Sequence, residues 1–200
     1  MGRDLLSKKP KIILASASPR RRDLLKPFFS LKIIPADCDE RQRSRENSSR
    51  YVKRIAVEKW KIVARKLKST ELVVAADTIV VLNEKILGKP KNRTHAKKML
   101  QALSGEGHFV LSAVAVGWSS KKRPTYFLSK TKVFFRKLAK DEISDYLRRG
   151  EWRGKAGSYA VQGRALTFVS RIEGSLTGVV GLPLNETLSQ IEKIFSHPLL

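Results

Sequence analysis

Cysteine and histidine are scarce in this 200-residue sequence. The single cysteine, Cys38, cannot form an internal disulfide, and one thiol cannot build a multi-cysteine zinc site. The three histidines, His95, His108 and His197, stand far apart, without the i, i+4 spacing of metal ligands on one helix. These shortages exclude a disulfide framework and a zinc module, and they favour a reducing, cytoplasmic setting.

Long hydrophobic runs are also missing. No apolar stretch approaches the ~18 residues that a helix needs to span a bilayer. The run over residues 12–15 near the N-terminus is too short for the core of a signal peptide. No membrane partner is therefore expected. The chain has no G-x-x-x-x-G-K-[ST] loop either, which disfavours an ATPase of that type.

Positive charge, in contrast, is abundant. Lys and Arg number 41 against 18 Asp and Glu, so the formal net charge is +23, while 42% of the residues are apolar, enough for a sizeable core. Such an excess suggests a polyanionic partner, for which nucleic acid, nucleotides and an acidic membrane surface are the alternatives. The familiar sequence signatures of nucleic-acid-binding modules are absent, so no specific nucleic acid is expected, although a basic nucleic-acid-binding protein stays as an alternative.

Apolar periodicity and capping residues predict alternating strands and helices, followed by hairpins. Ser18 and Thr94 are expected to cap helices, and Gly150 to end one. The length fits one domain over residues 1–200. The pattern predicts an α/β fold with a mixed sheet. Strands are expected over 11–15, 31–35, 71–82, 86–87, 108–118, 125–136, 165–172 and 178–180, and helices over 19–28, 51–67, 94–103, 141–149 and 184–195.

The first candidate for chemistry is the turn Ser16-Ala17-Ser18-Pro19-Arg20-Arg21 between a predicted strand and a predicted helix. Free N–H groups at the start of a helix attract anions, and arginine forks match phosphate geometry. Two hydroxyls and two guanidinium groups at this point could hold several phosphate oxygens. A capped surface helix with solvated arginines explains the same residues about equally well.

Asp77 is the second candidate, because it lies in the middle of the apolar segment 73–81. A carboxylate in such a place is costly unless it is paired or binds a metal ion. It could therefore serve as a base or as a metal ligand. The alternative is a structural Asp that backbone amides or Thr78 satisfy.

Weaker candidates come from turns and glycine-rich loops. A lysine on a fixed turn, a glutamine beside two glycines, a glycine-rich approach to a helix and an acidic pair suited to Mg²⁺ could each bind part of a nucleotide. Taken singly, each has an ordinary structural explanation: a solvated lysine, a packed loop, a tight corner or a solvated acidic pair. These residues are Lys89, Gln162, the segment 174–184, and Asp39 with Glu40.

Taken together and in order, five motifs resemble those of the Maf family, over residues 12 to about 188. Their combination is far more specific than any one alone. The motifs are Ser16-x-Ser18-Pro19-Arg20-Arg21, Ala76-Asp77-Thr78-Ile79-Val80, Leu87-Gly88-Lys89-Pro90, Ala156-Gly157-x-Tyr159-x-x-Gln162-Gly163 and Val180-Gly181-Leu182-Pro183-Leu184.

This resemblance implies a nucleoside triphosphate pyrophosphatase, which cleaves between the α- and β-phosphates and releases a nucleoside monophosphate and pyrophosphate. It also implies an elongated α/β fold similar to inosine triphosphatases, with two lobes around a central cleft within a single domain. A divalent metal, Mg²⁺ or else Mn²⁺, would be needed, and a homodimer is expected. The family's association with septum formation supplies a regulatory alternative to the enzyme.

The family's residue roles are expected at matching positions of this chain. Asp77 would be the general base, and the motif variants are similar to those of the branch that prefers dTTP and UTP. Whether Asp77 accepts a proton, ligates the metal or does both stays open at this level. Base selectivity would depend on Arg20, Thr78 and Gln162; metal binding on Glu40 and Asp77; and phosphate binding on Ser16, Ser18, Arg21, Lys59 and Lys89.

Overall fold

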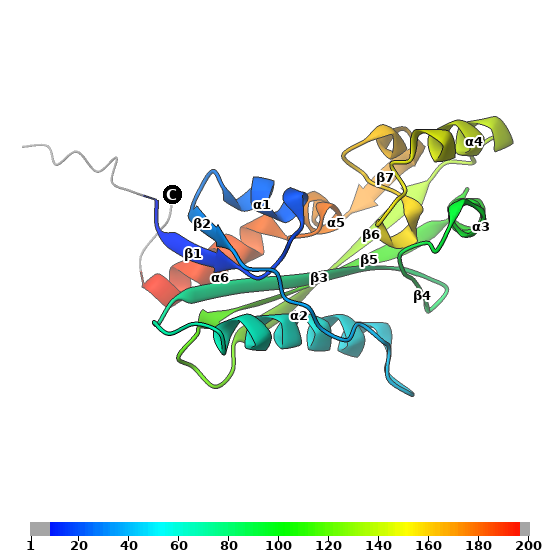
Figure 1. Cartoon of the computed structure of the whole chain (residues 1–200). Helices are drawn as coiled ribbons and strands as arrows, with labels where there is room; N and C mark the ends of the chain where they lie inside the picture. The colour runs from blue at the N-terminus through cyan, green and yellow to red at the C-terminus, as the bar shows by residue number, and fades with distance from the viewer. Residues whose placement is uncertain (1–8, 197–200) are drawn as a thin grey trace, which may run out of the picture.

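The computed structural model describes residues 9–196, so His197 lies outside the described residues. These residues form a seven-stranded mixed sheet with the order β2-β1-β3-β5-β6-β7, and β4 pairs with β3 (Figure 1). The α/β prediction is thereby confirmed. The strands are β1 (Lys11–Leu14), β2 (Ser30–Ile33), β3 (Leu72–Leu82), β4 (Lys85–Leu87), β5 (Gly107–Trp118), β6 (Thr125–Phe135) and β7 (Val169–Glu173).

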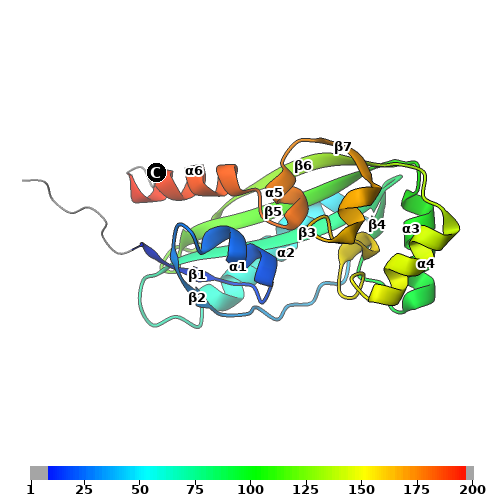
Figure 2. The same cartoon turned by 90° about the horizontal axis from the view of Figure 1, so that it is seen from above.

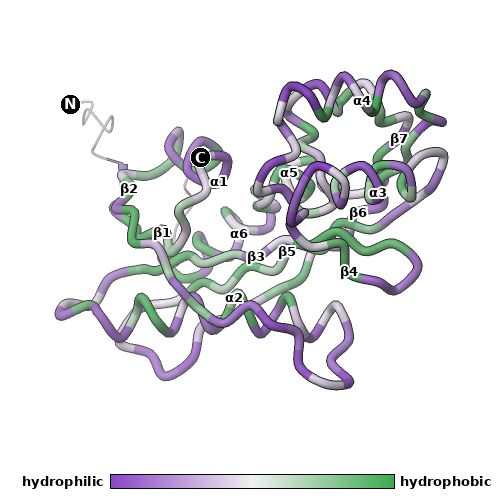
Figure 3. Tube along the Cα trace, turned by 45° about the vertical axis from the view of Figure 1, so that its right-hand side comes forward, coloured by the Kyte–Doolittle hydropathy of each residue, from purple (hydrophilic) through white to green (hydrophobic). Residues whose placement is uncertain are grey.

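The long antiparallel pair β3 and β5 runs through the whole molecule and gives it an elongated shape (Figure 2). Both strands are largely apolar and almost entirely buried, because helices cover both of their faces. The hydropathy colouring shows the same pattern, with apolar residues along the central strands and polar residues on the outer helices (Figure 3). The sheet is therefore the common support for everything that borders the site.

Three groups of helices surround the sheet (Figures 1 and 2). On one face lies the amphipathic helix α2, which Asn47 caps by accepting a hydrogen bond from the backbone N–H of Arg50 at 2.9 Å. The opposite face carries α1, α5 and α6, while α3 and α4 pack together at the far end. Their bounds are α1 (Pro19–Leu25), α2 (Ser48–Ala64), α3 (Arg93–Leu103), α4 (Lys140–Arg149), α5 (Leu176–Val180) and α6 (Leu184–Phe195).

The edge of β3 that faces β1 is only partly paired. The parallel strand β1 pairs with Val73 and Val74 and then leaves, and the antiparallel strand β4 pairs only from Val80 onward. Within residues 9–196, no strand pairs with this edge between Val74 and Val80. Asp77 and Thr78 lie in that gap, and because side chains alternate along a strand, they point to opposite faces while bordering the same opening.

Three local predictions differ from the structure. Residues 178–180 belong to the short helix α5, because Ser175 accepts a hydrogen bond from the backbone N–H of Gly178 at 3.0 Å and starts a helical turn. The first half of the strand expected over 165–172 is a 3₁₀ helix, Arg164–Phe168. Asn92, not Thr94, caps α3 through a 2.8 Å bond from the backbone N–H of His95. In α5, a cap hydrogen bond thus overrode the β-propensity of a short apolar segment.

Among residues 9–196, no helix combines the length and the apolar character that crossing a membrane requires.

Candidate active site

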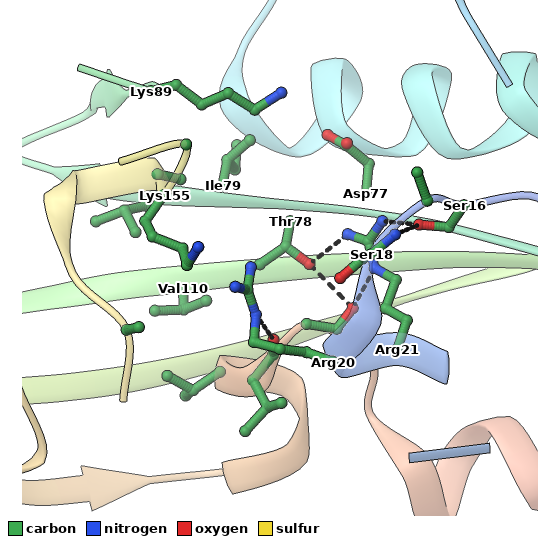
Figure 4. Close-up of a pocket in the computed structure, with 18 of the residues that line it drawn as sticks. Ser16, Ser18, Arg20, Arg21, Asp77, Thr78, Ile79, Lys89, Val110 and Lys155 are labelled. Atoms are coloured by element: carbon green, nitrogen blue, oxygen red, sulfur yellow. Dashed lines mark hydrogen bonds between the residues drawn. The ribbon is translucent and has the colours of Figure 1, made fainter. Parts of the chain in front are cut away.

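A cavity of about 640 Å³ opens at the gap in the edge of β3. Its walls come from the turn after β1, from the segment after β2, from α2 and the middle of β3, from the end of β4, from the loop that follows α4, and from the end of α5. Segments far apart in the sequence thus meet around Asp77 (Figure 4). The polar residues that line it are Ser16, Ser18, Arg20, Arg21, Glu40, Tyr51, Lys59, Asp77, Thr78, Lys89, Lys155, Tyr159 and Gln162.

One end of the cavity holds a cluster of two carboxylates and two ammonium groups. Lys59 on α2 lies with its Nζ 2.7 Å from Asp77 Oδ1 and 2.7 Å from Glu40 Oε1. Lys89 approaches Glu40 Oε2 at 3.4 Å. Burial alone would lower the pKa of Lys59, but the two carboxylates more than offset this and raise it. Lys59 is therefore the partner of the Asp77 carboxylate. The structural alternative had expected Thr78 or backbone amides in that role.

The irregular segment that carries Glu40 is fastened to α2. Tyr51 donates a hydrogen bond from its hydroxyl to the backbone carbonyl of Glu40 at 2.7 Å. One turn further on, Arg54 donates to Glu46 at 2.7 and 2.8 Å and to the carbonyl of Arg41 at 3.0 Å. Helix α2 thus positions both Lys59 and the loop that brings Glu40 to it.

Replacing Glu46 by Gln should destabilise the protein at neutral pH and much less at acid pH. The hydrogen bond from Arg54 lowers the pKa of Glu46 from its ordinary 4.5 to about 2. A lowered pKa stabilises the fold above about pH 4.5, and this contribution is lost as the pH falls toward 2. We expect a loss of about 1 kcal/mol in the free energy of unfolding at pH 7, measured by urea denaturation. Glu106→Gln, at an exposed position, is the control; equal losses at pH 7 and pH 3 would contradict the pairing.

Arg21 is brought into the cavity but is held there by protein oxygens. Its three guanidinium nitrogens donate to the carbonyl of Gly181 at 2.9 Å, to Ser16 Oγ at 3.1 Å and to Thr78 Oγ1 at 3.2 Å. These bonds tie α1, β1, β3 and the end of α5 together. Its positive charge borders the cavity, while its donors are largely used in holding the walls in place.

Thr78 is similarly engaged. Besides Arg21, its Oγ1 contacts Ser112 Oγ at 2.8 Å and the carbonyl of Gly181 at 3.2 Å. Ser112 in turn donates to the carbonyl of Gly178 at 2.7 Å. A hydroxyl has one proton to donate, so Thr78 has little hydrogen-bonding capacity left for a ligand. Its contribution to the site lies chiefly in placing Arg21 and the end of α5.

At the turn after β1, Ser16 is buried and Ser18 is half-buried. Ser16 Oγ accepts a hydrogen bond from the backbone N–H of Ser18 at 3.2 Å. The expected capping bond from Ser18 to the first turn of α1 does not form, although Pro19 does occupy the start of the helix. The Ser18 hydroxyl is therefore available to a ligand in the cavity.

The other end of the cavity differs in character. Arg20 uses one nitrogen to donate to the carbonyl of Val180 at 3.3 Å, and Lys155 lies near it. Gln162 lines the same region on an exposed loop. Apolar side chains form the remaining walls here; they are Val80, Val110, Val161, Val179 and Val180.

Every residue to which the family resemblance gave a role lines this cavity, whereas Asp39, the other member of the acidic pair, does not. The lining residues are Ser16, Ser18, Arg20, Arg21, Glu40, Lys59, Asp77, Thr78, Lys89 and Gln162. Two polar lining residues were not recognised from the sequence. Tyr51 left no signal, because an aromatic residue near the start of an amphipathic helix is typical of a core position. Lys155 opens the loop motif in which only the glycines and Gln162 attracted attention, although a lysine beside a glycine turn is itself a signal.

The donor atoms fit a magnesium ion that shares its ligands with a substrate. Glu40 and Asp77 each place a carboxylate oxygen 2.7 Å from the Lys59 nitrogen. Residues 9–196 contain no group of three or more His, Cys, Asp or Glu side chains that could hold a metal. Because Mg²⁺ is often held by one or two carboxylates plus substrate phosphates and water, two hard oxygen donors at this point suffice.

Comparison with known proteins gives the same picture over nearly the whole chain. The family model of Maf-like proteins matches residues 11–194. The dTTP/UTP pyrophosphatase of Pelotomaculum thermopropionicum is 44% identical over 184 residues, covering 92% of this chain and 96% of that protein. The dTTP/UTP pyrophosphatase of Nitrosospira multiformis is 45% identical over 196 residues, covering 92% and 94%.

A solved structure of a HAM1 protein from Coxiella burnetii superposes on this chain with a TM-score of 0.50 at 15% identity. The superposition covers 94% of this chain and 98% of that one, so the two proteins have a similar fold. The order of motifs, the cavity that they line and a match from residue 11 to residue 194 lead to one conclusion: this chain belongs to the Maf family.

Proposed function

We propose that this protein hydrolyses dTTP and UTP to the nucleoside monophosphate and pyrophosphate. The observation that carries this proposal is the placement of Asp77, a nine-tenths-buried carboxylate, in a cavity lined by five Lys and Arg side chains. A nucleoside triphosphate supplies the negative charge that such a cavity lacks. The relatives named above, at 44 and 45% identity, are both dTTP/UTP pyrophosphatases.

In the proposed reaction, a water oxygen bonds to the α-phosphorus while the bond from that phosphorus to the α,β-bridging oxygen breaks. Asp77 accepts the proton of the water, and pyrophosphate leaves with the bridging oxygen. Catalysis of this kind depends mostly on positioning and on neutralising charge. Lys59 fixes the carboxylate of Asp77 at 2.7 Å. Phosphate oxygens can be bound by Lys89, with a side chain that is 64% exposed, and by the hydroxyls of Ser16 and Ser18. Arg21 contributes its positive charge at the cavity wall.

A divalent metal, Mg²⁺ or Mn²⁺, belongs to the proposal as a cofactor. Glu40 and Asp77 would hold it together with phosphate oxygens. When bound, such an ion neutralises charge on the phosphates and makes the attacking water more acidic. The support is the donor set at Lys59 together with the family resemblance.

A panel of nucleoside triphosphates assayed for pyrophosphate tests the reaction and the base preference together. With Mg²⁺ present, UTP and dTTP should release pyrophosphate faster than CTP, ATP and GTP. The product also decides the site of cleavage, since attack at the γ-phosphate would yield orthophosphate instead. Release of orthophosphate, or no hydrolysis of any member of the panel, would contradict the proposal.

Removal of divalent ions should abolish hydrolysis, because without them the phosphate oxygens next to Glu40 and Asp77 meet like charge and the attacking water is not made more acidic. We expect that dialysis against a chelator reduces pyrophosphate release to background and that added Mg²⁺ or Mn²⁺ restores it. Ca²⁺, which tolerates larger and less regular coordination, is the matched control. Full activity in the chelator would show that the lysines and arginines alone suffice.

The proposal includes a single catalytic unit over residues 1–200 and assembly as a homodimer, which the family resemblance supports. It also includes a cytoplasmic setting, which the scarcity of cysteine supports. Sedimentation analysis decides between one copy and two. A basic nucleic-acid-binding or septum-regulating role is not favoured, because the relatives across nine-tenths of the chain are named as pyrophosphatases.

A further inference from the structure

Two cations at the apolar end of the cavity, Lys155 and Arg20, have no acidic partner among residues 9–196. The ion pairs of the cavity all involve Glu40 and Asp77, which Lys59 and Lys89 already contact. The side chain of Lys155 makes one hydrogen bond, from its Nζ to the carbonyl of Arg153 at 3.3 Å. Arg20 uses only its Nε, at 3.3 Å from the carbonyl of Val180. Most of the donors on both side chains are therefore free.

Placing these cations together is unfavourable in the absence of a ligand. Burial lowers the pKa of Lys155, and the charge of Arg20 lowers it further. Burial also lowers the pKa of Arg20. Two like charges that approach each other in a partly buried site are stabilised when a ligand supplies electron-rich oxygen atoms. The arrangement thus indicates a binding role for Lys155 as well as for Arg20.

The backbone around Lys155 is firmly held. The N–H of Gly157 donates to the carbonyl of Gly88 at 3.2 Å, and the N–H of Ser158 donates to the carbonyl of Lys155 at 3.1 Å. Gly157 has a φ of +66°, and a Cβ at that position would lie 3.0 Å from the methyl groups of Val80, so the loop packs directly on β3. The fixed loop therefore places the backbone of Lys155 at the cavity wall, where its side chain lies near Arg20 (Figure 4).

The walls at this end suit a flat ring rather than a polyphosphate. Valine side chains line it, including Val80, Val110 and Val180, whereas the hydroxyls and carboxylates lie toward Asp77. Gln162 makes no hydrogen bond within residues 9–196, so its amide offers an acceptor beside the two cationic donors. Uracil and thymine present two carbonyl oxygens that flank one ring N–H, which is the complement of two donors and one acceptor.

We propose that Lys155 is a further specificity-determining residue, whose ammonium group donates a hydrogen bond to a carbonyl oxygen of the uracil or thymine ring. Arg20 is the donor to the other carbonyl oxygen, and Gln162 accepts from the ring N–H. The inference rests on the proposed function and adds a residue and a selection rule to it. Cytosine carries an amine in place of one carbonyl oxygen, so its own donor would face a cation, and the site rejects it.

The test compares Lys155→Met with Lys155→Arg, and Lys122→Met in an exposed turn is the matched control. Lys155→Met should lose about tenfold or more in kcat/KM for UTP, since a hydrogen bond from a charged donor is lost. The loss for CTP should be smaller, so that the UTP-to-CTP ratio falls by a similar factor. Lys155→Arg keeps a cationic donor and should retain most of the preference, and Lys122→Met should match the wild type.

Binding of products separates a base contact from a phosphate contact. Calorimetry with UMP, CMP and pyrophosphate should show that Lys155→Met loses its preference for UMP over CMP, while its affinity for pyrophosphate is unchanged. Weakened pyrophosphate binding with an unchanged UMP-to-CMP ratio would overturn the inference, as would equal losses of kcat/KM for UTP and CTP. Because monophosphate binding needs no hydrolysis, a wild type that prefers UMP but releases no pyrophosphate would contradict the proposed function alone.

Discussion

Replacing Asp77 by Asn should reduce kcat for pyrophosphate release by about 10²- to 10⁴-fold, the range expected when a general base is removed. Asparagine has nearly the same shape, so it should leave the open edge of β3 and its walls in place. It cannot accept the proton of the attacking water, and it is a poorer ligand for Mg²⁺. The fall should therefore appear in kcat with UTP and dTTP alike, whereas the base-binding end of the cavity is untouched.

Asp39→Asn is the matched control for this variant. Asp39 lies one residue before Glu40, but its side chain is 59% exposed and pairs with Arg41 at 2.7 Å, outside the cavity. We expect its kcat to stay close to that of the wild type. A folded Asp77→Asn protein, judged by an unchanged circular dichroism spectrum, that still hydrolyses UTP at the wild-type rate would remove Asp77 from the proposed mechanism.

The long elements of the fold could be predicted from the sequence because their signals are local and repeated. The apolar run of β3 extends over 11 residues and the helical periodicity of α2 over 17, so many residues of each element indicate the same secondary structure. The short segment of α5, in contrast, was predicted wrongly as a strand. Its two valines favour a strand, but a single bond to the side chain of Ser175 and a turn at Gly181 decide the conformation. Hydrophobic periodicity does not predict hydrogen bonds of this kind between a side chain and the backbone.

The candidate site was predictable as a set of residues but not as an arrangement. The motifs name Arg20 and Arg21 as neighbours with the same chemistry. The structure separates them, since Arg21 donates to three protein oxygens while most of the donors of Arg20 remain free. Likewise, no spacing in the sequence shows that Lys59 bridges Asp77 and Glu40, because the three lie on different elements. Roles that depend on which partners a side chain already has require the tertiary structure.

The large positive charge is explained only at the cavity. Five of the 41 Lys and Arg residues line it. Others lie in exposed turns, as Lys121, Lys122 and Arg123 do, or pair on the surface, as Arg148 does with Asp145 at 2.7 Å. Charges of this kind can steer an anionic substrate toward the cavity at low ionic strength, but they do not select it.

Replacing Lys59 by Met should destabilise the protein by about 3 kcal/mol or more at neutral pH, the usual cost of removing one partner of a buried ion pair. The side chains of Lys59 and Asp77 are 10 and 12% exposed, so Asp77 would be left as a buried charge close to Glu40. Hydrolysis should fall as well, because Lys59 positions the carboxylate that accepts the proton. Urea denaturation at several pH values measures the loss of stability.

The pH dependence of that loss follows from the shifts in the wild type. The pKa of Lys59 is raised above 10.5, so its contribution to stability is present below that pH and is lost as the pH rises through the folded value. Contact with Lys59 outweighs burial and lowers the pKa of Glu40 below 4.5, so its contribution is present above that pH and is lost as the pH falls. The difference between Lys59→Met and the wild type should be largest between these limits and should shrink below pH 4.5, where protonation removes the unpaired charge.

Lys53→Met, at another position of α2, is the matched control, because it removes a lysine from the same helix without touching the carboxylates. It should change stability by less than about 0.5 kcal/mol, as expected for a surface substitution. A Lys59→Met protein as stable as this control would mean that solvent compensates Asp77 and Glu40 without the lysine. If the loss in free energy of unfolding were the same at pH 7 and pH 4, Lys59 would stabilise the protein through the packing of its aliphatic part between α2 and β3, and not through its charge.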